Sequence, residues 1–252
     1  MSSDNNPLLV IIAGPNGSGK STFQKSQESL KHIPFVNADN IAKSLFKDIG
    51  KEESQKAQNI AQKQIENFIK EKQSFCFETV FSHPSKIDLI KRAKENGYTV
   101  ELVIISTENP NINIIRVKNR FKKGGHDVPT DKIKERYPRT LKNLSEAVLF
   151  VDSFEIIDSS NQDFVHLAKK PHNSSELSIF SELPDWTKDI ITSFKSKTDN
   201  KENDDNKGNE SAAFTIVYKE KTKKVKKNNG ECGRTTQKGT SCQRRGHCPY
   251  HG

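Results

Sequence analysis

Apolar residues in the first two thirds of the chain occur in short continuous runs, separated by longer stretches in which apolar and polar residues mix. Such runs are typical of strands that are buried on both faces, as in a parallel sheet covered by helices. The five runs are Leu8–Ala13, Ile33–Val36, Ser74–Val80, Thr99–Ser106 and Ser153–Asp158. Their alternation with mixed stretches predicts an α/β fold with a parallel five-stranded sheet flanked by helices.

The mixed stretches have the spacing of helices. Residues 41–72 are rich in Ala, Gln, Lys and Glu and place apolar residues near a helical period, and residues 87–95 and 131–149 are also expected to be helical. Crossovers in a parallel sheet bring the carboxyl ends of the strands to one edge. We therefore expect the chemistry of the protein to lie where the apolar runs end.

Composition divides the chain into three parts. Residues 1–195 are expected to form the α/β domain. Residues 196–217 contain few apolar side chains and are predicted to be a largely disordered linker that ends in a short strand-like segment. Residues 218–252 hold ten Lys or Arg and two Glu, so this tail carries +8 of the chain's net charge of +9. An argument for nucleic-acid binding therefore applies to the tail alone.

Directly after the first run, the chain reads Gly-Pro-Asn-Gly-Ser-Gly-Lys-Ser-Thr. A loop of the form G-x-x-x-x-G-K-S between a strand and a helix is typical of a phosphate-binding loop, or P-loop. Its backbone N–H groups surround phosphate oxygens, Lys20 reaches the β- and γ-phosphates, and the Ser21 hydroxyl ligates Mg²⁺. The motif predicts binding of ATP or GTP. The residues expected to bind the nucleotide are Gly14, Pro15, Asn16, Gly17, Ser18, Gly19, Lys20, Ser21 and Thr22.

Acidic residues end the second and third runs. A carboxylate at this edge has a role in phosphoryl transfer, because the proton of the acceptor hydroxyl must be removed. Asp39 is the preferred general base, and the alternative is that it only caps the following helix. Glu78 is expected either to bind hydroxyls of the acceptor or to hold Mg²⁺ through water, and Thr79 is expected to hydrogen-bond the acceptor.

A basic segment follows the fourth run. Arginines that close over a nucleotide stabilise the charge that develops on the phosphoryl oxygens, and Arg120, Arg136 and Arg139 are the candidates for this role. The pair Gly124-Gly125 is expected to let the segment move as a lid. His126 either donates a hydrogen bond to phosphate or folds the turn.

Together these motifs resemble those of the zeta-toxin group of P-loop kinases. The resemblance spans about residues 7–195 and rests on Gly14–Thr22, Val36–Asp39, Phe77–Thr79, the stretch from Arg120 to Pro129, Arg136–Arg139 and Leu183–Trp186. It implies an ATP-dependent kinase with a nucleoside-monophosphate-kinase-like fold, of the kind that an antitoxin protein controls. It further implies UDP-N-acetylglucosamine, a UDP-sugar, as acceptor, Asp39 as the base, and phosphate contacts from Lys20 and two of the three arginines.

The tail carries a second candidate site. Cys232, Cys242, Cys248 and His251 offer three thiolates and one imidazole, a set suited to tetrahedral zinc, and four protein ligands leave no position open for catalysis. The spacing resembles a short zinc module found at the end of diverse microbial proteins. The sequence therefore predicts a small structural zinc module.

Two function classes remain open at this point. One is a kinase for a small molecule, and the other is a nucleic-acid-associated P-loop ATPase or polynucleotide kinase that its basic tail targets to RNA or another polyanion. The chain has no apolar stretch of about 18 residues, and its first residues lack the basic start of a signal peptide. We expect a cytoplasmic protein that makes no membrane contact.

Overall fold

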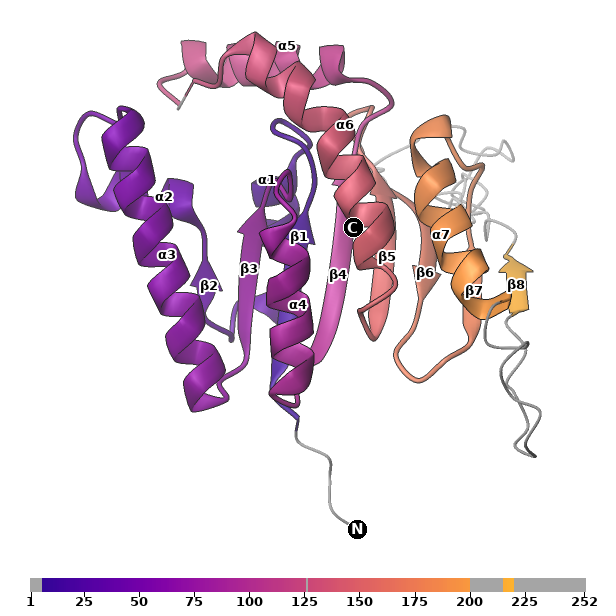
Figure 1. Ribbon diagram of the computed structural model, residues 1–252. Helices are drawn as coiled ribbons and strands as arrows, with labels where there is room; N and C mark the ends of the chain where they lie inside the picture. The colour runs from indigo at the N-terminus through magenta and orange to yellow at the C-terminus, as the bar shows by residue number, and fades with distance from the viewer. Residues whose placement is uncertain (1–5, 126, 200–214, 220–252) are drawn as a thin grey trace, which may run out of the picture. The chain divides into compact units, whose positions relative to one another are not determined.

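A computed structural model describes residues 6–125, 127–199 and 215–219 (Figure 1). The strands are β1 (Leu8–Ala13), β2 (Phe35–Val36), β3 (Phe75–Thr79), β4 (Thr99–Ser106), β5 (Ser153–Asp158), β6 (Val165–Lys170), β7 (Glu176–Ile179) and β8 (Thr215–Tyr218). The helices are α1 (Lys20–Ser26), α2 (Ala38–Leu45), α3 (Lys51–Glu71), α4 (Ser85–Glu95), α5 (Pro110–Lys122), α6 (Thr130–Ala147) and α7 (Lys188–Asp199), with 3₁₀ turns at Glu28–Leu30 and Asp185–Thr187.

The strands form one sheet with the order β2-β3-β1-β4-β5-β6-β7-β8. The first five strands of the chain pair in parallel, as the sequence predicts. The expected sheet of five parallel strands is wrong in extent, because β6 and β7 add antiparallel pairs and β8 then pairs in parallel with β7. The described sheet is therefore mixed and has eight strands.

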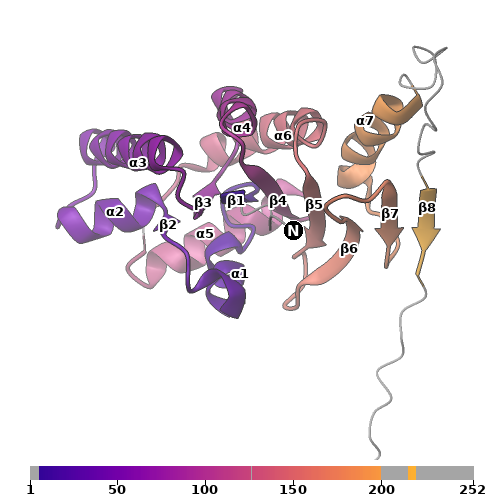
Figure 2. The same ribbon diagram turned by 90° about the horizontal axis from the view of Figure 1, so that it is seen from below.

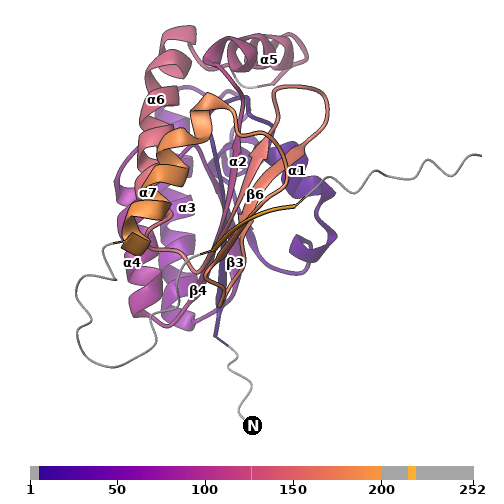
Figure 3. The same ribbon diagram turned by 90° about the vertical axis from the view of Figure 1, so that its right-hand side faces the viewer.

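Alternate residues of β1 enter two different cores. Leu9 and Ile11 belong to the larger core, which α3, α4, α6 and α7 line, whereas Val10 and Ile12 pack with Phe23 of α1 on the other face. Figures 2 and 3 show these four helices together on one side of the sheet and α1 on the opposite side. Burial on both faces explains why β1 reads as a continuous apolar run.

Helix α5 crosses the edge of the sheet toward which β1, β3 and β4 point (Figure 1). The helix expected over 41–72 is in fact two helices, since α2 ends at Leu45 and α3 begins at Lys51. Helix α7 runs through Asp199 and β8 joins the sheet, so both ends of the expected linker contribute regular structure. No helix in the part of the chain that the structure describes is long and apolar enough to cross a membrane.

Candidate active site

The P-loop occupies the turn between β1 and α1, the strand–loop–helix context that the motif requires. A side chain at Gly14 would place its Cβ 1.9 Å from the Ile105 carbonyl oxygen. Gly17 has φ +81°, and a Cβ there would lie 2.7 Å from the Asn113 carbonyl oxygen. Asn113 also donates from Nδ2 to the Asn16 carbonyl oxygen at 2.8 Å. The loop is thus packed against β4 and α5 so closely that glycine is required at both positions.

Lys20 is buried at the first position of α1, and its Nζ donates to the Pro15 carbonyl oxygen at 2.9 Å. Burial lowers the pKa of its ammonium group below the ordinary value, while the charges of Glu78 and then Asp39 act to raise it. The charge of Arg120 acts in the same direction as burial. Three of the charged residues that the sequence singles out are therefore close enough to Lys20 to change its proton affinity.

Glu78 lies beside the hydroxyl that the P-loop offers to a metal ion. The Ser21 Oγ donates to Glu78 at 3.0 Å from each carboxylate oxygen, and Asn37 Nδ2 donates to Glu78 Oε2 at 2.7 Å. A hydroxyl and a carboxylate are the ligand types that Mg²⁺ prefers. Of the two roles expected for Glu78, this geometry favours the one on the metal side.

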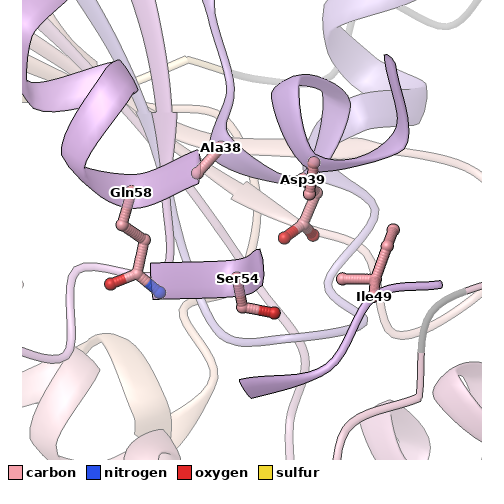
Figure 4. Close-up of a pocket in the computed structure, with 6 residues that line it drawn as sticks. Ala38, Asp39, Ile49, Ser54 and Gln58 are labelled. Atoms are coloured by element: carbon pink, nitrogen blue, oxygen red, sulfur yellow. The ribbon is translucent and has the colours of Figure 1, made fainter. Parts of the chain in front are cut away.

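Asp39 lies in the first turn of α2 and does not cap it. The N-cap is Asn37, whose side chain accepts from the Asn40 N–H, so the alternative assignment of Asp39 as the cap is wrong. Asp39 instead lines a small hollow between α2 and α3 of about 20 Å³. Figure 4 shows its carboxylate and the Ser54 hydroxyl directed toward this hollow. The residues that line it come from α2, α3 and the segment between them.

Thr79 and helix α6 shape the neighbouring loop. Thr79 Oγ1 accepts from the Phe81 N–H at 3.1 Å, so this side chain holds a turn after β3. From α6, Thr140 donates to the Val80 carbonyl oxygen and Asn143 to the Phe81 carbonyl oxygen, each at 3.0 Å. The helix that carries Arg136 and Arg139 is therefore fastened to the end of β3.

The expected lid arginines have different environments. Arg139 is half exposed and pairs with Glu135 at 3.2 Å, and Arg136 is partly buried on the same helix. Arg120 lies near the end of α5, where its carbonyl oxygen accepts from Gly125 N–H at 3.0 Å. Of the three, Arg120 is the one whose charge acts on Lys20. His126 lies outside the described residues.

The loop between β5 and β6 borders the P-loop, and no motif in the sequence singled it out. Ser159 Oγ lies 2.8 Å from the Ser18 carbonyl oxygen and 3.1 Å from that of Ser106. Arg116 donates to the Ser159 and Asn161 carbonyl oxygens at 2.6 and 2.8 Å. Phe164 stacks edge-on against Phe23 of α1. The rule that ligand-binding residues follow strand ends would have pointed to this loop after Asp158.

The residues present fit a nucleotide and a magnesium ion. The backbone of the P-loop is packed closely against Ile105 of β4 and Asn113 of α5. Two buried side-chain atoms of the loop, Asn16 Oδ1 and Ser18 Oγ, have no hydrogen-bond partner among the described residues. Buried polar atoms of this kind call for a polar partner. Ser21 and Glu78 are suited to hold Mg²⁺, and Lys20 is suited to hold phosphate.

The other candidate sites are a second metal site and a cysteine nucleophile, and neither is seen among the described residues. Within the described ranges, no group of three or more His, Cys, Asp or Glu side chains is arranged to hold a metal ion. The predicted zinc ligands Cys232, Cys242, Cys248 and His251 lie outside those ranges. Cys76 is buried in β3, and burial raises the pKa of its thiol to about 12, so it is not activated as a nucleophile.

Comparison with known protein families matches residues 1–170 to the zeta toxin family. The chain belongs to the zeta toxin family. It is also 34% identical over 128 residues to an uncharacterized protein of Haemophilus influenzae, an alignment that covers 51% of this chain and 91% of that protein. Family membership and the P-loop geometry together support an ATP-dependent phosphotransferase.

Solved structures share the fold of this zeta toxin family member. The AvrRxo1-ORF1:-ORF2 complex with ATP aligns with a TM-score of 0.55 and 19% identity, over 66% of this chain and 59% of that one. The PezAT chromosomal toxin-antitoxin system of Streptococcus pneumoniae aligns with a TM-score of 0.52 and 14% identity, over 79% and 88%. The chain thus spans about three fifths of the AvrRxo1 chain. At these identities the likeness shows the fold alone, a P-loop kinase-like α/β fold.

Proposed function

We propose that this protein is an ATP-dependent kinase that transfers the γ-phosphoryl group to a hydroxyl of a small molecule. The observation that carries the proposal is the convergence of Lys20, Ser21, Glu78 and Asp39 at one edge of the sheet, where both carboxylates act on the buried ammonium of Lys20. Phosphate binding, metal binding and a base are the parts that phosphoryl transfer needs.

Each residue then has a defined task. Lys20 and the backbone of the P-loop hold the phosphates, and Ser21 and Glu78 hold the magnesium ion, which neutralises phosphate charge when bound. Asp39 accepts the proton of the acceptor hydroxyl as this oxygen attacks the γ-phosphorus and the bond to the β-phosphate oxygen breaks. Arg120, with Arg136 or Arg139, stabilises charge on the transferred group.

We further propose a UDP-sugar such as UDP-N-acetylglucosamine as the acceptor and an antitoxin protein as a partner. The first follows from the resemblance of the motifs to those of zeta-toxin kinases. The second is supported by the fold shared with the PezAT toxin-antitoxin system. The zinc module of the tail also stays a proposal from the sequence, and elemental analysis of the purified protein for one Zn²⁺ per chain tests it.

The test of the function is ATP consumption by the purified protein with UDP-N-acetylglucosamine, with free N-acetylglucosamine and with RNA that carries 5′-hydroxyl ends, followed by mass spectrometry of the products. We expect a phosphorylated sugar nucleotide, and we expect Lys20→Ala to abolish it. The exposed lysine of the same helix offers a matched control, Lys25→Ala, which should retain full turnover. Phosphorylated RNA in place of the sugar nucleotide would favour the polynucleotide kinase, and undiminished turnover by Lys20→Ala would overturn both assignments.

A further inference from the structure

We propose that Asn37 is a positioning residue that holds the Glu78 carboxylate against Ser21 and thereby sets the affinity of the site for Mg²⁺. This inference rests on the proposed function, because it assigns a role to Asn37 within the same nucleotide site. It differs from the assignments above in that Asn37 itself is not expected to touch the nucleotide or the ion.

The side chain of Asn37 uses both ends of its amide. It is only 6% exposed, its Oδ1 accepts from the Asn40 N–H at 3.0 Å, and its Nδ2 donates to Glu78 Oε2 at 2.7 Å. The first bond caps α2, the helix that carries Asp39. The second bond fixes one oxygen of the carboxylate. The Asn37 side chain thus connects the start of α2, which carries Asp39, to the carboxylate of Glu78.

The register of the sheet explains why these residues meet. Val36 of β2 pairs with Phe77 of β3, so Asn37 and Glu78 are the next residues on two adjacent parallel strands. Ile12 of β1 pairs with Glu78 on the other side, two residues before the P-loop begins at Gly14. Asn37, Glu78 and the P-loop therefore lie side by side at the carboxyl ends of three neighbouring strands, β2, β3 and β1.

The bond from Asn37 matters because Ser21, which also donates to this carboxylate, is expected to have a second task. Ser21 donates to both oxygens of Glu78 at 3.0 Å, but its hydroxyl is also the group expected to bind the ion. Asn37 is the donor that orients the carboxylate and is not itself a ligand. Removal of an outer hydrogen-bond partner of a metal ligand typically lowers metal affinity or activity by about 10- to 100-fold.

The substitution Asn37→Ser separates the two bonds. Serine caps helices about as well as asparagine, so the start of α2 is kept, while the amide donor to Glu78 is lost. The dissociation constant of ATP is measured by calorimetry for the full chain, once with Mg²⁺ and once with EDTA. The ratio of the two values gives the tightening that the ion provides. We expect Asn37→Ser to reduce this ratio by about 10- to 100-fold and to leave the affinity for metal-free ATP unchanged.

Two further variants make the test specific. Asn109→Ser changes the corresponding N-cap of α5, an exposed residue whose side chain accepts from the Asn111 N–H, and should leave the ratio as in the wild type. Asn37→Ala should lose the same Mg²⁺ effect as Asn37→Ser and should also melt at a lower temperature, because it lacks the cap.

The outcomes separate this inference from the proposed function. If Mg²⁺ tightens ATP binding equally in the wild type and in Asn37→Ser, Asn37 is only a helix cap and the inference is wrong, while the kinase assignment stands. The inference is also wrong if metal-free ATP binding falls together with the Mg²⁺ effect. Absence of ATP binding by the wild type would overturn the proposed function and this inference with it.

Discussion

Asp39 and Asn37 lie two residues apart and have different surroundings. Asn37 is buried and makes two hydrogen bonds that shape the site, whereas Asp39 is exposed in the first turn of α2 and lines a small hollow between α2 and α3. Because the Asp39 carboxylate is exposed, the proposed acceptor can reach it. At the scale of the residue, Asn37 thus makes the hydrogen bonds that hold the site, and the exposed Asp39 is left for the proposed role of base.

The substitution Asp39→Asn tests the role of this carboxylate. It keeps the shape of the side chain and removes the base, so we expect MgATP to bind as in the wild type and kcat to fall by about 10²- to 10⁴-fold. The melting temperature should not change, because the cap of α2 is Asn37. Steady-state kinetics and thermal unfolding measure both quantities.

The matched control is Asp88→Asn, since Asp88 is the acidic residue in the first turn of α4 and is exposed. It should leave kcat unchanged. An Asp39→Asn protein that turns over normally would remove Asp39 from the mechanism, whatever its melting temperature.

At the scale of the element, the loop between β5 and β6 is held from outside by α5. The guanidinium of Arg116 donates to carbonyl oxygens of Ser159, Ser160 and Asn161, and Ser159 in turn contacts the Ser18 carbonyl oxygen of the P-loop. Hydrogen bonds from a charged donor are stronger than those between neutral groups. Arg116 therefore stabilises the position of one loop that borders the nucleotide site, a task other than the phosphate contact expected of the other arginines.

We predict that Arg116→Gln weakens ATP binding by about tenfold. The loss of hydrogen bonds from a charged donor costs about 1.5–3 kcal/mol. Part of this cost appears as weaker nucleotide binding, because the loop between β5 and β6 is then less well ordered. The rate constant kcat should change far less than KM for ATP. Lys118→Gln on the exposed face of the same helix provides the comparison and should behave as the wild type. A lowered kcat with an unchanged KM would argue that Arg116 acts on the transferred phosphoryl group instead.

Elements with a strong local signal could be predicted from the sequence. The strands β1, β4 and β5 have the bounds of their apolar runs, since burial on both faces favours apolar residues at successive positions. The short strands β6 and β7 carry polar residues within Val165–Lys170 and Glu176–Ile179 and showed no such run. The break between α2 and α3 falls at 46–50, where the composition still resembles a helix until Gly50.

The residues of the candidate site likewise fall into those that a local motif predicts and those that gain their role only from the fold. The P-loop is a contiguous motif, so its nine residues could be recognised in the sequence alone. Asn37 gains its role from the pairing of β2 with β3, and Arg116 from the approach of α5 to the β5–β6 loop. Contacts of this kind join residues that are about 40 positions apart in the chain, and a local pattern does not encode them.

At the scale of the whole sheet, the nucleotide site and the last strand lie at different places in the strand order. The site gathers at the ends of β2, β3 and β1, whereas β8 is the last strand beyond β7. Strand β8 joins through backbone pairing, through Ile216, which packs against the larger core, and through an ion pair between Lys219 and Glu176 at 3.4 Å. We therefore expect this strand to stabilise the fold without affecting the candidate site.

A pair of substitutions in β8 tests this separation. Truncation of a buried Ile to Ala costs about 2–5 kcal/mol, and Ile216 is only partly buried, so we expect Ile216→Ala to lower the free energy of unfolding by about 1–2 kcal/mol. The dissociation constant of MgATP should stay within a factor of two, about 0.4 kcal/mol at 25 °C.

The control is Tyr218→Ala in the same strand, which removes a side chain that is 75% exposed and should change neither quantity. Urea unfolding and calorimetry measure the two effects. Equal stability of Ile216→Ala and Tyr218→Ala would show that the Ile216 side chain contributes nothing to the core, and a large loss of ATP affinity in Ile216→Ala would show that the far edge of the sheet is coupled to the site.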